Sequence, residues 1–384
     1  MFYRRVGHVP PKRHTVHHDA DGVRLLEELV GQEGFSDVSS LLYHRHSPSA
    51  LVSIDAIDDD RSPLCALQPV APVHLRTGEV ATGDDPVLGR RLLLGNDDVR
   101  VCVAWATASS PLYRDAVGDQ LVYVQSGTCV LESVLGTTHL RDGDYVVINR
   151  GIAHQWSLTD GAVELLIFES SGHIRPPRKY LSAAGQFLEG APDCERDIRP
   201  PAGPHVVAGE GPVDVIVRTR AGLSRHRQAH HPFDVVGWDG GLYPWALSIH
   251  DFEPIVGSIH QPPPVHQTFE GPNFVVCSFV PRLFDFHPDA VKIPYFHSNV
   301  DSDEVIFYSQ GNFMSREGSG VTQRSITLHP PGFVHGPQPG SYERSVDKTR
   351  TEELAVMLDT FRPLQISETA LAVSDPNYIG SWSL

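Results

Sequence analysis

The chain has 384 residues, of which 40% are hydrophobic and 20% charged, a balance typical of a globular protein long enough for two domains. Its formal net charge of −16 argues against nucleic acid and anionic membrane surfaces as partners, since both would repel it. The five cysteines are scattered without CxxC spacing, so neither a disulfide framework nor a zinc knuckle is expected. Because the N-terminus shows no signal-peptide pattern and no apolar run approaches the ~20 residues of a membrane span, we expect a cytoplasmic protein.

Short runs of Val, Ile, Leu, Phe and Tyr lie between 33 glycines and 31 prolines, which predicts many short strands joined by tight turns. Near the N-terminus, Val23–Val30 has the spacing of one short amphipathic helix. Residues 176–227 are rich in Gly, Pro and Arg and are expected to connect or cover domains. The predicted strands, in chain order, are 121–125, 145–148, 163–168, 213–218, 274–280, 304–308 and 354–358.

The chain contains a weak internal repeat. Gln120–Gly127 resembles Glu304–Gly311, each being an apolar strand that ends in a glycine turn. Asn149–His154 resembles Pro330–His335, and the spacing from strand start to histidine is similar, 34 residues (120 to 154) and 31 residues (304 to 335). Two matches in register indicate two related β-domains.

From this repeat we expect three parts along the chain. They are an N-terminal arm (1–45), a first domain that has lost its site together with a connecting segment (46–230), and a second, catalytic domain (231–384).

The repeat also indicates which copy holds a metal. The second copy offers His297, Glu304 and His335, and two imidazoles with one carboxylate and open positions suit non-haem Fe(II) oxygen chemistry. The matching residues of the first copy are Tyr113, Gln120 and His154. Because tyrosine and a neutral amide are poor replacements for imidazole and carboxylate, we expect only the second copy to bind metal.

The spacing of these motifs resembles the two signatures of the cupin superfamily. Glu304 with six residues before Gly311, and Pro330-Pro-Gly-Phe-Val-His335, match those signatures. The expected fold is therefore all-β dominated, a bicupin of two jelly-roll domains with the C-terminal one catalytic.

Most of the chain also resembles the homogentisate 1,2-dioxygenase family. The similar segments are Leu25–Gly31, Phe233–Trp245, Ser258–Val265, Pro294–His297, Leu328–Pro337 and Asp375–Trp382. The resemblance implies an Fe(II) enzyme that opens the ring of homogentisate (2,5-dihydroxyphenylacetate), or of a hydroquinone-type relative, with both atoms of O2. It also implies a homo-oligomer, a trimer or hexamer.

Carried over residue by residue, the resemblance implies that His297, Glu304 and His335 bind Fe(II), with His335 also beside the substrate. It implies that His260 is the acid–base partner of a ring hydroxyl, for which an imidazole is suited. His329 would lie near the substrate or behind the ligands.

The chain departs from the family pattern at two places. One extra residue after His297 makes Asp303 a competitor of Glu304, and the six-residue spacing to Gly311 favours Glu304. Phe313 stands where the family has a substrate-contacting tyrosine, so a hydrogen bond worth roughly 1 kcal/mol is lost and the substrate is expected to be homogentisate or a relative of it. Arg316 and Arg350 are candidates to hold a substrate carboxylate, because guanidinium suits bidentate contact.

Two alternatives stay open. One is a dioxygenase for another phenolic ring, such as gentisate or hydroquinone, although the gentisate type uses three histidines and Glu304 argues against it. The other is a non-catalytic bicupin that binds a small molecule. The remaining histidines, among them His44, His46, His226, His230 and His231, show no spacing typical of metal ligands.

Overall fold

The structure is a computed structural model and describes residues 2–59, 62–209 and 211–383. In these ranges the fold is built almost entirely of strands, with two short α-helices, α1 (Ser341–Ser345) and α2 (Glu368–Ala372). Short 3-10 helices lie in the loops, namely η1 (Glu33–Phe35), η2 (Thr77–Glu79), η3 (Arg178–Tyr180), η4 (Glu195–Asp197), η5 (Ile249–Asp251), η6 (Pro263–His266), η7 (Met314–Arg316) and η8 (Tyr378–Ser383). No helix of the described part could cross a membrane. The all-β, two-domain fold expected from the sequence is confirmed.

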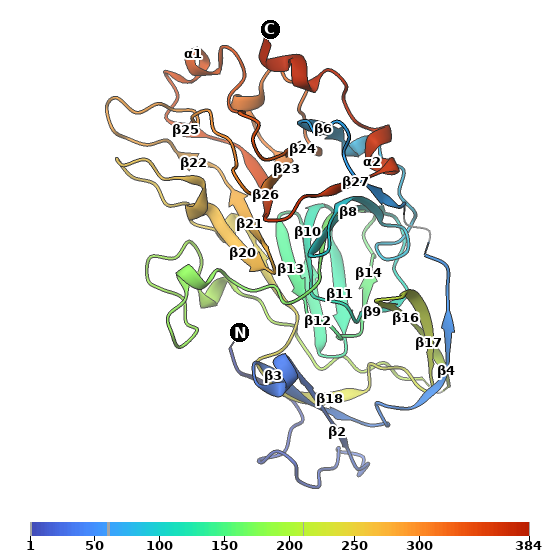
Figure 1. The fold of residues 1–384 in the computed structure, drawn as a ribbon. Coiled ribbons are helices and arrows are strands. Elements are labelled where there is room, and N and C mark those ends of the chain that lie inside the picture. Colours follow the sequence, from blue (N-terminus) through green and yellow to red (C-terminus); the bar gives the residue numbers. More distant parts are fainter. Residues whose placement is uncertain (1, 60–61, 210, 384) are drawn as a thin grey trace.

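An eight-stranded sheet lies at the centre of the molecule (Figure 1). Its strands, in spatial order, are β19 (Trp245–Ser248), β13 (Asp144–Ile148), β10 (Gln120–Ser126), β15 (Val163–Ser170), β8 (Val99–Ala106), β7 (Arg91–Gly95), β27 (Gln365–Ser367) and β5 (Leu64–Cys65). Successive side chains of β10 enter two different cores, Leu121 and Tyr123 on one face and Val122 and Val124 on the other. The apolar run of β10 is therefore continuous because both of its faces are buried.

A seven-stranded sheet covers one face of the central sheet and closes the first barrel. Its strands are β12 (Gly136–Leu140), β11 (Cys129–Ser133), β14 (His154–Ser157), β9 (Leu112–Asp115), β16 (Val213–Thr219), β17 (Gly222–Gln228) and β4 (Leu51–Ala56). Trp156 and Ile216 from this sheet pack with Val122 and Leu165 of the central sheet. A four-stranded sheet at the N-terminal end consists of β1 (Arg4–Gly7), β18 (Val235–Gly240), β3 (Ser39–His44) and β2 (Leu26–Gly31).

A six-stranded sheet forms the second barrel, with strands β20 (Gln267–Gly271), β21 (Phe274–Phe279), β26 (Leu354–Thr360), β23 (Asp303–Gln310), β24 (Ser325–His329) and β6 (Val73–Arg76). The small pair β22 (Arg282–Leu283) and β25 (Arg350–Thr351) lies beside it. Phe307 packs against Tyr123 of the central sheet, with ring centroids 6.4 Å apart. Because strand side chains alternate, Glu304, Ile306 and Tyr308 face the opposite way, into a cavity.

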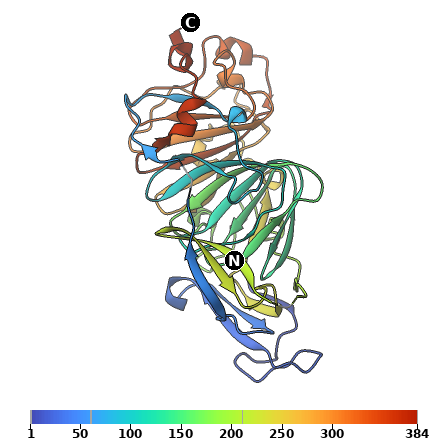
Figure 2. The same cartoon turned by 90° about the vertical axis from the view of Figure 1, so that its right-hand side faces the viewer.

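The two halves exchange strands. β6 comes from the N-terminal half but pairs with β24 of the second barrel, and β27 comes from the C-terminal half but pairs with β7 of the first. Farther on, β18 and β19 lie beyond residue 230 and pair with β3 and β13. The expected boundary between 230 and 231 stays a prediction, and it falls where strands of both halves are interleaved. Figure 2 shows the parts stacked end to end, with the blue N-terminal strands farthest from the red C-terminus.

Every strand predicted from the sequence is present, within a few residues at each end. The helix predicted at Val23–Val30 is wrong, because Leu26–Gly31 is strand β2 and pairs antiparallel with β3. One short match to helical spacing could not compete with a neighbouring strand that satisfies the backbone hydrogen bonds.

Candidate metal centre

Three side chains predicted as metal ligands converge at one end of the second barrel. The backbones of His297 and His335 pair with each other through N–H···O bonds of 2.9 and 2.8 Å, which fixes the two imidazoles side by side. The Nε2 atoms of these histidines lie 3.4 and 3.3 Å from the carboxylate oxygens of Glu304, on the adjoining strand β23. One ligand atom from each residue lies within 4.8 Å of the others, as a single ion would require.

Both imidazoles present the same nitrogen to this point. In each ring Nδ1 faces the carbonyl oxygen two residues earlier, at 3.3 Å from Tyr295 and 3.0 Å from Phe333. A histidine held through Nδ1 by a carbonyl has Nε2 free to bind a metal. The buried Nε2 of His335 has no hydrogen-bond partner among the described residues. The donor set, and a buried Nε2 of His335 that faces the Glu304 carboxylate without a hydrogen bond, fit a divalent cation bound by two imidazoles and one carboxylate.

Glu304 is held ionised in spite of its burial. Burial alone would raise the pKa of Glu304, but its contacts with His297, His329 and His335 hold that pKa well below the usual range. His329 Nδ1 lies 2.8 Å from Glu304 Oε1, and its Nε2 lies 2.9 Å from the Tyr378 hydroxyl. Burial lowers the pKa of His329 to about 4 even though Glu304 opposes this, so the ring is neutral near pH 7. His329 therefore lies behind the carboxylate and orients it.

The two neighbouring carboxyl groups, Asp303 and Asp359, do not belong to the triad. Asp303 points away from the histidines and accepts a 2.6 Å hydrogen bond from the backbone N–H of Leu364. Asp359 lies directly opposite Glu304 in the β23–β26 ladder. Burial, followed by the charge of Glu304, raises the pKa of Asp359 to about 8, so this carboxyl is protonated near neutral pH. Glu304 is thus the carboxylate that reaches both imidazoles.

The first barrel repeats this arrangement with different side chains. Tyr113 and His154 pair through their backbones as His297 and His335 do, and their rings meet edge to face at 5.5 Å. His154 Nδ1 also faces the carbonyl two residues earlier, that of Ile152, at 3.0 Å. Gln120 Nε2 lies 3.4 Å from the Tyr113 hydroxyl. The three residues thus have the same backbone relation as the triad of the second barrel, without its donor set.

Fixed charges surround this first-barrel site. Arg218 lies 2.8 Å from Asp115 and 3.0 Å from Glu169, and Arg90 lies 3.0 Å from Glu169. Gln120 donates to Asp115 at 3.0 Å. The Arg90 guanidinium lies over the Tyr113 ring, 5.6 Å from its centroid. Two guanidinium groups therefore supply beside this site the positive charge that a cation would bring.

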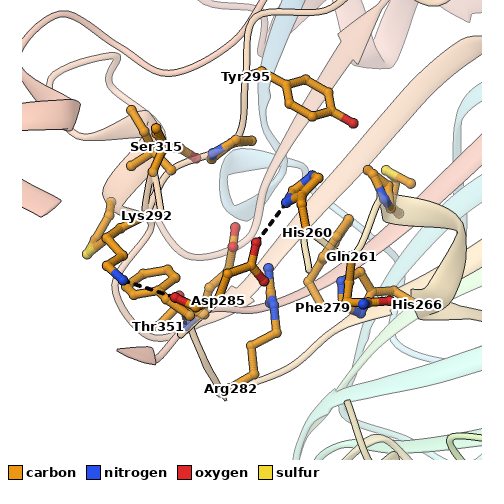
Figure 3. Close-up of a pocket in the computed structure, with 18 of the residues that line it drawn as sticks. His260, Gln261, His266, Phe279, Arg282, Asp285, Lys292, Tyr295, Ser315 and Thr351 are labelled. Carbon is orange, nitrogen blue, oxygen red and sulfur yellow. Dashed lines mark hydrogen bonds and ion pairs between the residues drawn. The ribbon is translucent and has the colours of Figure 1, made fainter. Parts of the chain in front are cut away.

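A cavity of about 390 Å³ opens beside the triad and is lined by His297 and Glu304. His260 reaches it from the loop before η6, and its Nδ1 lies 3.0 Å from a carboxylate oxygen of Asp285 (Figure 3). The Tyr295 ring meets the His260 ring edge to face at 5.2 Å. Because Asp285 engages Nδ1, the Nε2 of His260 is left to accept a proton from a bound molecule.

Positive side chains also line the cavity. Arg282 rises into it in Figure 3, donates to the Val280 carbonyl at 3.1 Å, and has no ion pair among the described residues. Arg316 is buried and donates to the Tyr308 hydroxyl and the Gly336 carbonyl, both at 2.9 Å. Lys292 donates to the Asp285 carbonyl at 3.0 Å.

Three of the four predicted substrate contacts do not line this cavity. Arg350 is exposed and pairs with Glu352 at 2.6 Å. Phe313 lines a neighbouring hollow, and its ring meets the edge of Tyr308 at 5.0 Å. His335 lies at the triad behind the cavity wall.

Several residues of this site were missed from the sequence. Arg282 and Asp285 stand in a segment without a recognisable pattern, and Tyr378 lies 49 residues after the histidine it contacts. The sequence Asp375–Trp382 was noted as similar to a family segment, but nothing in it indicated contact with His329.

Comparison with known proteins gives sequence relatives over all or two thirds of the chain. A protein of Saccharolobus solfataricus, provisionally named a dioxygenase, is 39% identical over 386 residues, covering 100% of this chain and 99% of that protein. Homogentisate 1,2-dioxygenase of Emericella nidulans is 27% identical over 279 residues, covering 67% of this chain and 60% of the fungal protein. Residues 99–249 match the family model described as the N-terminal part of homogentisate 1,2-dioxygenase.

Solved structures give more distant similarities. A cupin 2 conserved barrel domain protein of Leptotrichia buccalis is 8% identical, with a TM-score of 0.34 over 75% of this chain and 96% of that one. A Nostoc punctiforme protein, provisionally named a dioxygenase, is 12% identical, with a TM-score of 0.36 over 80% of this chain and 87% of that one.

Proposed function

Because this chain belongs to the homogentisate 1,2-dioxygenase-like family of dioxygenases, we propose that it is an Fe(II)-dependent enzyme that opens the ring of homogentisate or of a close hydroquinone-type relative. The observation that carries the proposal is the convergence of His297, Glu304 and His335 beside a cavity large enough for a single aromatic ring with a short side chain. Two imidazoles and one carboxylate leave coordination positions open, as non-haem iron oxygenases require.

His297, Glu304 and His335 would hold the iron, which when bound supplies the redox chemistry that activates O2 beside an ionised ring. His260 takes the proton of a ring hydroxyl at Nε2, while Asp285 accepts from its Nδ1–H and stabilises the imidazolium that forms. His329 and Tyr378 fix the orientation of Glu304 from behind. The remaining apolar wall, which includes Ile306 and Phe279, limits access of water.

The acidic side chain of the substrate would be held by Arg282. This guanidinium lines the cavity without an ion pair among the described residues, and a carboxylate is its natural partner. Both oxygen atoms of O2 enter the product as the ring opens between the hydroxylated carbon and the carbon that bears the side chain. The product from homogentisate is a maleylacetoacetate-like, ring-opened acid.

The test is an aerobic assay of iron-loaded protein with homogentisate, gentisate and hydroquinone in parallel. We expect O2 uptake and a new absorbing product with homogentisate in preference to the other two rings, and none with Glu304→Gln after the same treatment with iron. Turnover of gentisate or hydroquinone in preference to homogentisate would overturn the substrate and keep the reaction class. Protein that binds no iron and consumes no O2 with any of the three rings would overturn the enzyme.

A further inference from the structure

The crossovers between two sheets bring together a second group of potential ligands, remote from the triad. Residues 45–50 connect β3 of the four-stranded sheet to β4 of the seven-stranded sheet, and residues 229–234 connect β17 back to β18. The two crossovers run side by side, because the Ala229 N–H donates to the Ala50 carbonyl at 3.0 Å. Figure 1 shows β3 and β18 at the opposite end of the molecule from β23 and β24.

His46 on one crossover meets His230 and Asp234 on the other. His46 Nδ1 lies 3.2 Å from Asp234 Oδ2, and the His46 and His230 rings stack with centroids 4.6 Å apart. One ligand atom from each of the three residues lies within 4.8 Å of the others, as in the triad of the second barrel. Two imidazoles and one carboxylate are a donor set suited to zinc and similar divalent metals.

His230 and Asp234 are each oriented by a partner outside the group. His230 Nε2 donates to the Ser47 carbonyl at 2.8 Å, so Nδ1, whose own contact with the His231 carbonyl is longer at 3.3 Å, is the nitrogen left for a metal. His44 Nδ1 lies 2.7 Å from Asp234 Oδ1, while Asp234 Oδ2 accepts the backbone N–H of His46 at 2.7 Å and also faces His46 Nδ1. Partners of this kind orient the ligands in metal sites of known function.

A chain of polar contacts holds the carboxylate of Asp234 in place. His44 Nδ1 faces Asp234 Oδ1, and His44 Nε2 lies 3.0 Å from a carboxylate oxygen of Glu28. A small cavity of about 30 Å³, lined by His44, His230, Asp234 and Glu28, adjoins the group and has room for a water molecule or an ion.

We propose that His46, His230 and Asp234 form a second, structural site for a zinc-class divalent metal, which links the two crossovers between the four-stranded and seven-stranded sheets. The exposed His46 leaves one side of the site open to solvent, so a water molecule completes the coordination and the metal exchanges with the medium. This site is independent of the proposed ring-cleaving reaction, because its residues lie outside the cavity beside the triad.

The experiment measures zinc binding to the metal-free full chain by equilibrium dialysis, with thermal unfolding as a second readout. In a Glu304→Gln background, which removes the carboxylate of the triad, we expect one zinc per chain and a higher Tm when zinc is added. Adding His46→Ala or His230→Ala is expected to weaken zinc binding at least tenfold and to abolish the rise in Tm, whereas adding His139→Ala, an exposed histidine on β12, changes neither.

Zinc binding is also measured with the wild-type chain, in which Glu304 is unchanged. There we expect two zinc ions per chain, falling to one in His46→Ala. The proposal is overturned if Glu304→Gln binds no zinc, or if the His46→Ala and His230→Ala variants bind it as tightly as the His139→Ala control. Neither result depends on iron loading or on turnover, so each is distinguishable from failure of the proposed reaction.

Discussion

At the scale of single residues, position within a strand decides which carboxylate can serve the metal. Asp303 and Glu304 are neighbours in β23, so their side chains leave opposite faces of the sheet. The Asp303 carboxylate accepts a hydrogen bond from the backbone N–H of Leu364, whereas the Glu304 carboxylate lies among three imidazoles. The spacing to Gly311 favoured Glu304 already in the sequence, because the glycine turn marks the strand register.

Glu304→Gln is expected to weaken iron binding at least ~100-fold, because the change removes the only charged ligand of the triad while keeping its size. It recreates in the second barrel the residue that the first barrel has at Gln120. Iron content after dialysis against a series of free iron concentrations measures the change.

Asp303→Asn is the matched control, since the amide oxygen can still accept from Leu364 N–H. This variant should keep iron at the wild-type level, and an equal loss in both variants would contradict the assignment of Glu304.

A second prediction at this scale concerns the pair of His260 and Asp285. His260→Gln should lower kcat by about 10²–10⁴-fold, the usual contribution of a general base. Asp285→Asn should lower kcat less and leave KM nearly unchanged, because Asp285 acts through the imidazole, which it holds at Nδ1.

Steady-state kinetics with the ring that is turned over checks this pair. The control is His287→Ala, an exposed histidine whose Nδ1 accepts the backbone N–H of Asp289. A His260→Gln variant with wild-type kcat would exclude His260 as the base.

At the scale of elements, strands were predictable and loops were not. Runs such as 121–125 and 304–308 are apolar because their sheets are covered, and that pattern is local in the sequence. The cavity is built differently, since Arg282 comes from β22, His260 from a loop and Arg316 from η7. Their proximity depends on where three irregular connections lie, which no short-range pattern records. Arg350 could be predicted only from its charge, because the sequence does not show which arginines line the cavity.

The pair β22–β25 gives a prediction at this scale. Arg282 lies opposite Thr351 in the ladder and both line the cavity, whereas Arg350, one residue earlier, is exposed. Arg282→Gln should raise KM for an acidic substrate by about 10–100-fold, as expected for a charged hydrogen bond of roughly 1.5–3 kcal/mol.

Arg350→Gln, on the partner strand, should leave KM unchanged. Measuring both variants against homogentisate and against hydroquinone, which lacks the carboxylate, isolates the contribution of charge. An equal effect of Arg282→Gln on both substrates would argue against a carboxylate contact.

At the scale of the whole molecule, the duplication was visible in the sequence and the strand exchange was not. The repeat showed two barrels, because each keeps its own glycine turn and histidine. It could not show that β6 and β27 are exchanged, since both are short and lie far from the strands with which they pair. The His46–His230 contact is hidden for the same reason, because these two histidines show no ligand spacing along the chain.

The exchange predicts cooperative unfolding. Because each barrel is completed by a strand from the other half, calorimetry of the metal-free chain should show one transition, with the calorimetric and van't Hoff enthalpies equal. A fragment of residues 46–230, which lacks β27, β18 and β19, should show no cooperative transition. Two separate transitions in the full chain, or a stable fragment, would show that the barrels fold independently.

The charged cluster in the first barrel has a consequence for metal binding there. Restoring Glu at position 120 would place a third carboxylate beside Asp115 and Glu169, and the positive charge that balances these two comes from Arg90 and Arg218. A returning metal ion would in turn meet both guanidinium groups, so reversal needs several simultaneous substitutions, each unfavourable alone. We therefore expect this charged cluster to disfavour metal binding in the first barrel, so that metal chemistry is expected only in the second barrel.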